Sequence, residues 1–220
     1  MIEDIRLFGN VNAGNCFLIL TDRREEATWA RTYEAVRVLR PDRERLLVFV
    51  PVEDWNRDLS PWKAEPVFGK EGFGDGAAET LSRIGTELLP YLERQYPREG
   101  RRFFVCGYSL AGLFALWAVC RTDAFSGVAG VSPSVWFPGW LVFAKEHPVR
   151  CGKVYLSLGD REERARNPLL ASVGNAIREQ EALLSGSGVP VCLEWNPGNH
   201  FADADGRLAR GIAWLEQEDA

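Results

Sequence analysis

The chain has 220 residues, a formal net charge of -5 and 46% hydrophobic residues. This length allows one domain with an ample core, and we expect a single domain over residues 1–220 because no Pro-, Gly- or Ser-rich stretch divides it. An acidic balance without a Lys/Arg cluster argues against nucleic acid and against an anionic membrane surface as partners. The apolar runs are too short to span a bilayer, and the acidic N-terminus is unlike an export signal, so we expect a cytoplasmic protein.

The chain contains five cysteines, an odd number, which are widely spaced and mostly lie within apolar patterns. No Cys pair or Cys/His cluster has the spacing of a zinc site. We therefore expect buried free thiols in a reducing compartment, and no metal. The five residues are Cys16, Cys106, Cys120, Cys151 and Cys192.

The predicted elements alternate between strands and helices. Strand patterns cover residues 2–8, 16–20, 46–52, 101–106, 126–131, 154–158 and 189–195. Helical patterns cover residues 25–39, 77–95, 110–120, 168–184 and 207–218. Continuous apolar strands that alternate with helices indicate a parallel sheet covered on both faces. We predict a doubly wound α/β fold, in which sites gather beyond the carboxyl ends of the strands.

The most informative motif is Gly-Tyr-Ser-Leu-Ala-Gly at residues 107–112, between an apolar strand and an apolar helix. A serine on such a sharp turn has its hydroxyl exposed above the sheet, where it can act as a nucleophile, so Ser109 is the candidate. The usual G-x-S-x-G pattern has glycine where this chain has Ala111, whose methyl group still permits a close crossing. An ordinary turn with an inert serine is the alternative for this motif taken alone.

A nucleophilic serine needs a base, and the chain has two histidines. His200 follows the last predicted strand, where a loop can bring the imidazole over the sheet, whereas we expect His147 to be a surface residue between elements. The acid that orients the histidine should follow the preceding strand. Asp160 and Glu162 both qualify. Glu162 is favoured, because three residues past the strand-ending Gly159 the chain has commonly turned back over the site.

Stabilising the oxyanion requires two backbone N–H groups. Leu110, which directly follows the nucleophile, supplies one of them. The other should come from the loop after the strand at residues 16–20, with Asp22 as the candidate, although only the order of the strands recommends it. The reaction assembled in this way needs neither a metal nor a cofactor.

Tryptophans are frequent in the two long irregular segments that should lie at the carboxyl edge of the sheet. There they could stack on acyl or aromatic groups of a substrate, or they could anchor the loops to the surface. Two tryptophans within predicted helices, Trp117 and Trp214, are expected in the core. The candidate substrate-binding residues are Trp55, Trp62, Trp136 and Trp140.

Several stretches together resemble a known family: the turn at Ser109, residues 56–62 (NRDLSPW), residues 131–136 (VSPSVW) and the Gly-x-His stretch before Phe201. They are similar to the esterase family of α/β-hydrolases, which includes esterase D, enterobactin-type siderophore esterases, feruloyl esterases and mycolyltransferases. The resemblance covers nearly the whole chain and implies a serine carboxylic-ester hydrolase that works through an acyl-enzyme. The chain departs from the family at residues 21–23, where members commonly carry Asp-Gly, and its short length leaves room for only a minimal lid.

The sequence thus favours a small-molecule ester substrate, attacked by Ser109 with His200 as the base. An acyltransferase would use the same residues but admit an alcohol or thiol acceptor, and a peptidase can be built on the same fold. A non-catalytic scaffold with a decayed site is the alternative from another class, and its support is the unusual loop at residues 21–23.

Overall fold

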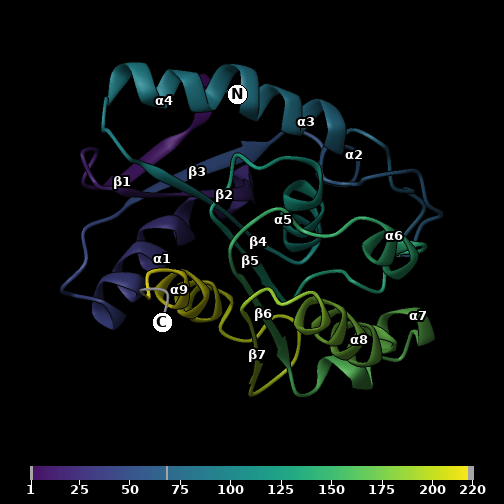
Figure 1. The fold of residues 1–220 in the computed structure, drawn as a ribbon. Helices are drawn as coiled ribbons and strands as arrows, with labels where there is room; N and C mark the ends of the chain where they lie inside the picture. The colour runs from purple at the N-terminus through teal and green to yellow at the C-terminus, as the bar shows by residue number, and fades with distance from the viewer. Residues whose placement is uncertain (1, 68, 218–220) are drawn as a thin grey trace.

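The computed structural model describes residues 2–67 and 69–217. Over these residues the sheet has seven strands in the order β1-β3-β2-β4-β5-β6-β7 (Figure 1). The first strand runs antiparallel to β3, and all other neighbours are parallel. The strands are β1 (Arg6–Gly9), β2 (Asn15–Asp22), β3 (Leu46–Val52), β4 (Arg102–Tyr108), β5 (Gly127–Val131), β6 (Val154–Gly159) and β7 (Val191–Asn196).

Helices cover both faces of this sheet, which confirms the predicted doubly wound α/β fold (Figure 1). On one face, α1 (Glu26–Leu39) packs beside α9 (Ala204–Leu215). The longer helices of the other face are α5 (Leu110–Arg121) and α8 (Val173–Gly186). The shorter elements are α2 (Trp55–Asp58), α3 (Ala77–Arg83), α4 (Leu89–Gln95), α6 (Trp140–Glu146), α7 (Pro168–Ala171) and the 3-10 turns η1 (Ile2–Asp4), η2 (Arg23–Glu25) and η4 (Glu162–Arg164).

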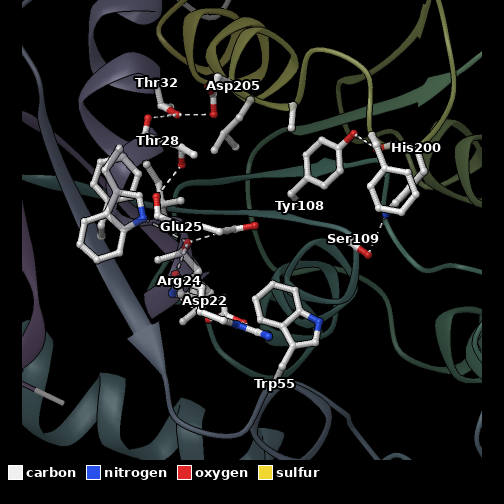
Figure 2. Close-up of a pocket in the computed structure, with 18 residues that line it drawn as sticks. Asp22, Arg24, Glu25, Thr28, Thr32, Trp55, Tyr108, Ser109, His200 and Asp205 are labelled. Atoms are coloured by element: carbon white, nitrogen blue, oxygen red, sulfur yellow. Dashed lines mark hydrogen bonds and ion pairs between the residues drawn. The ribbon is translucent and has the colours of Figure 1, made fainter. Parts of the chain in front are cut away.

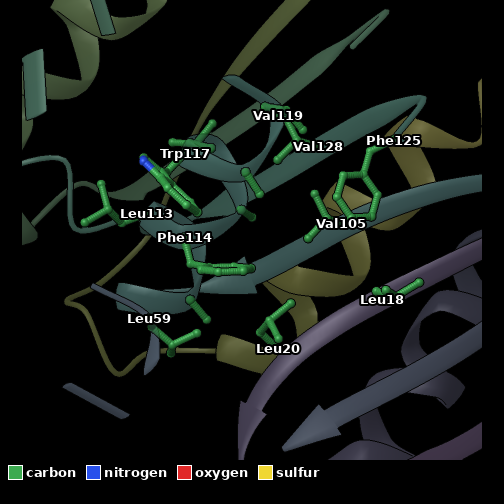
Figure 3. Close-up of a cluster of buried hydrophobic side chains, with 14 of the residues drawn as sticks. Leu18, Leu20, Leu59, Val105, Leu113, Phe114, Trp117, Val119, Phe125 and Val128 are labelled. Atoms are coloured by element: carbon green, nitrogen blue, oxygen red, sulfur yellow. The ribbon is translucent and has the colours of Figure 1, made fainter. Parts of the chain in front are cut away.

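Two apolar cores, one on each face, follow from the alternation of side chains along the strands. In β2, Phe17 and Ile19 join the core beneath α1 and α9. Leu18 and Leu20 join the opposite core, where Phe114 of α5 also lies (Figure 3). The residues of α5 from Leu110 to Cys120 are all buried, as expected for a helix that is apolar on nearly every side.

Two elements in the first half of the chain differ from the prediction for local reasons. The predicted helix over residues 77–95 is α3 and α4 joined by the π-helical turn η3 (Ile84–Leu88). Pro90 lacks a backbone N–H and its ring excludes the carbonyl four residues back, so the regular helical ladder cannot pass through this point. The first strand begins at Arg6 because residues 2–4 form a 3-10 turn.

The last two helices also differ from the prediction. The predicted helix over residues 168–184 consists of α7 and α8, which meet at Ser172. The final helix starts at Ala204, three residues earlier than predicted, after Asp203 adopts a left-handed conformation with φ 53°. It ends at Leu215, and the predicted end at residue 218 lies outside the described residues.

The five cysteines are free, as predicted. Four are buried, and Cys192 is half-buried. Burial raises the pKa of the Cys16 and Cys120 thiols to about 12, so these groups stay protonated and unreactive at neutral pH. Among the described helices, none combines the length and apolar character needed to cross a membrane.

Candidate active site

Ser109 forms the sharp turn between β4 and α5, with φ 58° and ψ -122°. This conformation is unfavourable for a residue with a side chain, so neighbouring bonds must hold it. The backbone N–H of Ser109 donates to the carbonyl of Val131 at 3.0 Å, and its own carbonyl accepts from the N–H of Ser134 at 3.0 Å and of Leu113 at 3.1 Å. The strained turn that the motif predicted is therefore fixed by β5, by the segment after β5 and by α5.

The close crossing of strand and helix depends on Gly107. A Cβ atom at Gly107 would lie 2.2 Å from the backbone carbonyl oxygen of Ala111. A Cβ atom at Gly112 would meet the carbonyl oxygen of Gly107 at 3.0 Å. The two glycines thus provide the space for the crossing, and the close approach at Gly107 involves the backbone of Ala111 and not its methyl group.

The imidazole of His200 lies between a hydroxyl and a carboxylate. Its Nε2 is 3.1 Å from Oγ of Ser109, and its Nδ1 is 2.7 Å from Oε2 of Glu162. An ionised carboxylate only accepts hydrogen bonds, so Nδ1 carries the proton that it donates to Glu162. Nε2 is then the acceptor for the Ser109 hydroxyl. The arrangement suits a general base whose tautomer is held by an acid.

The structure also distinguishes the two candidate acids. The carboxylate of Asp160 is exposed and accepts the backbone N–H of Gly198 at 2.8 Å. The side chain of Glu162 is only 4% exposed and contacts His200 directly. Asp160 therefore supports the loop that precedes His200, whereas Glu162 holds the imidazole itself.

The second carboxylate oxygen of Glu162 is held by three donors. Oε1 accepts from the N–H of Gly159 at 2.7 Å, from the hydroxyl of Ser132 at 2.7 Å and from Nη1 of Arg207 at 3.0 Å. Burial alone would raise the pKa of Glu162. The hydrogen bonds from His200, Gly159 and Ser132 outweigh this effect, so the pKa lies below its usual value and the carboxylate stays ionised at neutral pH.

Arg207 is fully buried and connects the loop of His200 to this carboxylate. Its Nη2 donates to the carbonyls of Pro197 and Asn199, both at 3.1 Å. The hydroxyl of Tyr108 donates to the carbonyl of His200 itself at 2.6 Å. The backbone on both sides of the imidazole is therefore anchored to the protein interior.

Sequence reasoning did not identify Ser132, Arg207 or Tyr108 as site residues. Ser132 lies in the stretch that carries the family resemblance, and its left-handed conformation (φ 43°) is a further sign of a constrained position. Tyr108 lies within the motif at Ser109. Arg207 gives no signal in sequence, because it is one of several charged residues in an amphipathic helix and only its burial distinguishes it.

The two candidate oxyanion donors, Leu110 and Asp22, lie at the start of a helix and at the end of a strand. Leu110 opens α5, and the first N–H groups of a helix have no partner within it. Asp22 ends β2 and lines a cavity together with Ser109. Its carboxylate accepts from the backbone N–H of Arg24 at 2.9 Å and from that residue's guanidinium, which lowers the pKa of Asp22.

Two cavities open from Ser109 and His200. The first has a volume of about 350 Å³ and is also lined by Trp55, Asp22 and Tyr108 (Figure 2). We call it the Trp55 arm. The second has a volume of about 440 Å³ and is lined by Trp136, and we call it the Trp136 arm. Phe201 lines both arms, and its side chain is 86% exposed. The serine hydroxyl can thus be reached from two sides.

The four candidate tryptophans separate into two pairs. Trp55 lines one arm and Trp136 lines the other, so both remain candidates for substrate binding. For Trp62 and Trp140 the expectation needs correction, because neither lines an arm that contains Ser109. The indole N–H of Trp62 donates to the carbonyl of Pro138, and Trp140 is 1% exposed and donates to Gln180. Trp62 therefore ties its own segment to the loop at Pro138, and Trp140 ties α6 to α8.

Trp117 and Trp214 were expected in the core and His147 outside the site, and the core placement is confirmed in full for Trp117 alone of the two tryptophans. Trp117 is buried in the core, whereas Trp214 is half-buried and packs at the edge of the core on the other face. His147 lies outside both arms, with its ring stacked on Phe143 at 4.2 Å.

Comparisons with known proteins agree with this fold. The family described as "Putative esterase" matches residues 21–187. The ferri-bacillibactin esterase BesA of Bacillus subtilis (strain 168) is 29% identical over an alignment of 131 residues, and the match covers 55% of this chain and 45% of that protein. The chain therefore matches less than half the length of this curated relative.

Two solved structures show the same fold. An IroE-like serine hydrolase from Shewanella oneidensis has a TM-score of 0.79 and 17% identity, covering 96% of this chain and 74% of the other. Siderophore hydrolase EstB from Aspergillus nidulans has a TM-score of 0.76 and 19% identity, covering 96% and 89%. With the family match over residues 21–187, these findings lead to one conclusion: the chain belongs to the esterase family of α/β-hydrolases.

Proposed function

We propose that the protein is a serine hydrolase that cleaves carboxylic esters of small molecules. One observation carries the proposal: the continuous hydrogen-bonded chain from Ser109 through His200 to Glu162, built on a strained strand-to-helix turn. Each member has a partner that fixes its orientation, which a decayed site would not need to preserve. These contacts therefore weigh against a non-catalytic scaffold.

In the proposed reaction, Oγ of Ser109 attacks the ester carbonyl while Nε2 of His200 takes the hydroxyl proton. Glu162 stabilises the imidazolium that forms. The backbone N–H of Leu110 donates to the developing oxyanion, and the loop at Asp22 supplies the second donor. His200 then gives its proton to the departing alcohol, leaving an acyl group on Ser109.

The second half of the reaction releases the acyl group. A water molecule attacks the acyl-enzyme carbonyl while His200 accepts one of its protons. Collapse of the tetrahedral intermediate frees a carboxylic acid and returns the proton to Ser109. No step requires a group other than these residues and water.

Two observations support a small-molecule substrate. The arms, of about 350 and 440 Å³, have the size of small-molecule sites. The similar proteins BesA and EstB are described as a ferri-bacillibactin esterase and a siderophore hydrolase, so siderophore esters are natural candidates for testing. We further propose a single domain and a cytoplasmic location, supported by one continuous sheet and by the five free thiols.

The first test is labelling with a fluorophosphonate probe, alongside hydrolysis of short and medium p-nitrophenyl esters and of a matched p-nitroanilide. We expect the wild type to be labelled and to cleave the esters in preference to the anilide. Ser109→Ala should lose labelling and at least about a thousandfold in kcat. A folded wild-type protein that neither reacts with the probe nor cleaves an ester would overturn the proposal, and preferred anilide cleavage would indicate a peptidase.

A further inference from the structure

The Trp136 arm differs from the Trp55 arm in its charged residues. Arg161 and Arg164 line it, and both side chains are exposed to solvent. Leu170 and Val173 give the same cavity an apolar wall beside the half-buried Trp136. The arm therefore offers positive charge next to apolar surface, and it opens directly on Ser109.

The acidic residues that neighbour these arginines in sequence are engaged elsewhere. Asp160 accepts the N–H of Gly198, and Glu162 is held by His200 and Arg207. The third carboxylate, that of Glu163, pairs with Arg178 of α8 at 3.0 Å. The segment at residues 160–164, Asp-Arg-Glu-Glu-Arg, has three acidic and two basic residues, and all three carboxylates are thus engaged with groups other than its own two arginines.

As a result, neither Arg161 nor Arg164 forms an ion pair with any carboxylate in the part of the chain that the structure describes. The one carboxylate inside the arm, Glu162, is compensated by the buried guanidinium of Arg207 at 3.0 Å. The arm consequently carries an uncompensated positive charge close to the nucleophile.

The Trp55 arm has the opposite balance. Asp22 pairs with Arg24, and Asp205 pairs with Arg31, so the charges of these residues are neutralised. Glu25, which also lines this arm, accepts only the hydroxyl of Thr21 among the bonds described for its carboxylate. An anionic group is therefore disfavoured in the Trp55 arm and favoured in the Trp136 arm.

We propose that the Trp136 arm binds a negatively charged group of the ester substrate, with Arg161 and Arg164 contacting the charge and Trp136 contacting an adjacent apolar or aromatic portion. Guanidinium groups suit this role because their planar array of donors matches a carboxylate. The substrate class is then an anionic ester rather than a neutral one. This inference rests on the proposed hydrolase function of the same site.

The test uses pairs of esters that differ in one charge. One pair places the charge on the acyl side: mono-4-nitrophenyl adipate and its methyl ester. The other places it on the alcohol side: the butyrate ester of 4-hydroxybenzoate and that of methyl 4-hydroxybenzoate. For each enzyme, kcat/KM for the anionic ester is divided by kcat/KM for the neutral ester. This ratio is then compared between the variant and the wild type, so that the different chemical reactivities of the two esters cancel.

In at least one pair, we expect the double variant R161Q/R164Q to lower this ratio by about tenfold, mainly through KM, because two charge-assisted contacts to the anionic group are lost. Hydrolysis of the neutral ester should change by less than about twofold. The wild-type ratio should also fall as salt rises from low to high concentration, because the contacts are near solvent.

Arg166 provides a matched control. It lies in the same segment, is exposed and does not line the arm. Arg166→Gln removes the same charge from the protein and should leave the ratio unchanged. An equal effect of Arg166→Gln would show that net charge, and not the arm, is responsible.

The outcomes separate the two proposals. If the wild type cleaves neutral esters but the double variant leaves both ratios unchanged, the anion-binding inference is wrong and the hydrolase function stands. If no ester of either charge is cleaved by a folded enzyme, the proposed function fails first.

Discussion

Arg207 and Glu162 form an ion pair in the protein interior, with Nη1 3.0 Å from Oε1 and the two side chains 0% and 4% exposed. The pair links the last helix to the turn after β6. The same guanidinium holds the carbonyls of Pro197 and Asn199, so the segment before His200 belongs to the same network. A residue outside the predicted site therefore contacts both Glu162 and the segment that precedes His200.

Removing Arg207 should be costly. Arg207→Met keeps much of the volume but leaves the buried Glu162 carboxylate without its cation, and we expect a loss of about 3–5 kcal/mol in the free energy of unfolding. Urea denaturation followed by tryptophan fluorescence measures this loss. Arg207→Lys, which retains the charge but not the planar fork, should lose less. A loss below about 1 kcal/mol in Arg207→Met would show that the pair contributes little.

The two candidate acids should behave differently on substitution. Glu162→Gln removes the negative charge that stabilises the imidazolium, and its single amide oxygen cannot accept both from His200 and from the donors that hold Oε1. We expect kcat to fall by about 10²–10⁴-fold with folding retained. Asp160→Asn keeps an oxygen that accepts the N–H of Gly198, and kcat should stay within about threefold of the wild type. Steady-state kinetics on one p-nitrophenyl ester compares them. The reverse ranking would identify Asp160 as the acid.

The lowered pKa of Glu162 predicts how stability depends on pH. The group is ionised in the folded protein below its ordinary value of 4.5, so its contribution is fully present above about pH 4.5. It is lost as the pH falls through the lower folded pKa. The stability difference between the wild type and Glu162→Gln should therefore be largest near pH 7 and shrink below pH 4.5. Urea midpoints measured from pH 7 to 3 test this, and a constant difference would contradict it.

The two small residues at the strand-helix crossing should not be equivalent. Gly107→Ala places a Cβ 2.2 Å from the carbonyl oxygen of Ala111, and because both atoms belong to rigid elements we expect a loss of about 3 kcal/mol or more. Ala111→Gly, which restores the usual pattern, should cost only about 1 kcal/mol through helix propensity. Thermal unfolding of both variants compares them. Equal losses would mean that the crossing can relax.

The tryptophans offer a further pair of variants. Trp136→Ala should raise KM for aromatic esters by about tenfold, with little effect on stability, because this ring lines the cavity beside Ser109. Trp140→Phe should lower stability by about 1–3 kcal/mol through the unpaired Gln180 and leave KM unchanged. Kinetics and unfolding of both variants would reveal an exchange of these roles, which would refute our assignment.

Local patterns in the sequence predicted most of the fold. Continuous apolar strands such as β3 and an all-apolar helix such as α5 can only be buried, so the parallel sheet followed from composition and order. The position of the turn at Ser109 was also predictable, because its motif lies between an apolar strand and an apolar helix along the chain. Its strained conformation is held by bonds to Val131 and Ser134. The interruption at Pro90 shows the limit, since the helical period continues through a residue that cannot complete the ladder.

The sequence by itself determined the order of the elements and the residues that could be nucleophile and base, because these depend on neighbours along the chain. Only the tertiary structure showed that Glu162, and not Asp160, contacts His200, although the two lie two positions apart and follow the same strand. It also decided which tryptophans face a cavity and revealed Arg207, whose partners lie up to 99 positions away. Such contacts depend on how distant segments pack, and no local pattern records them.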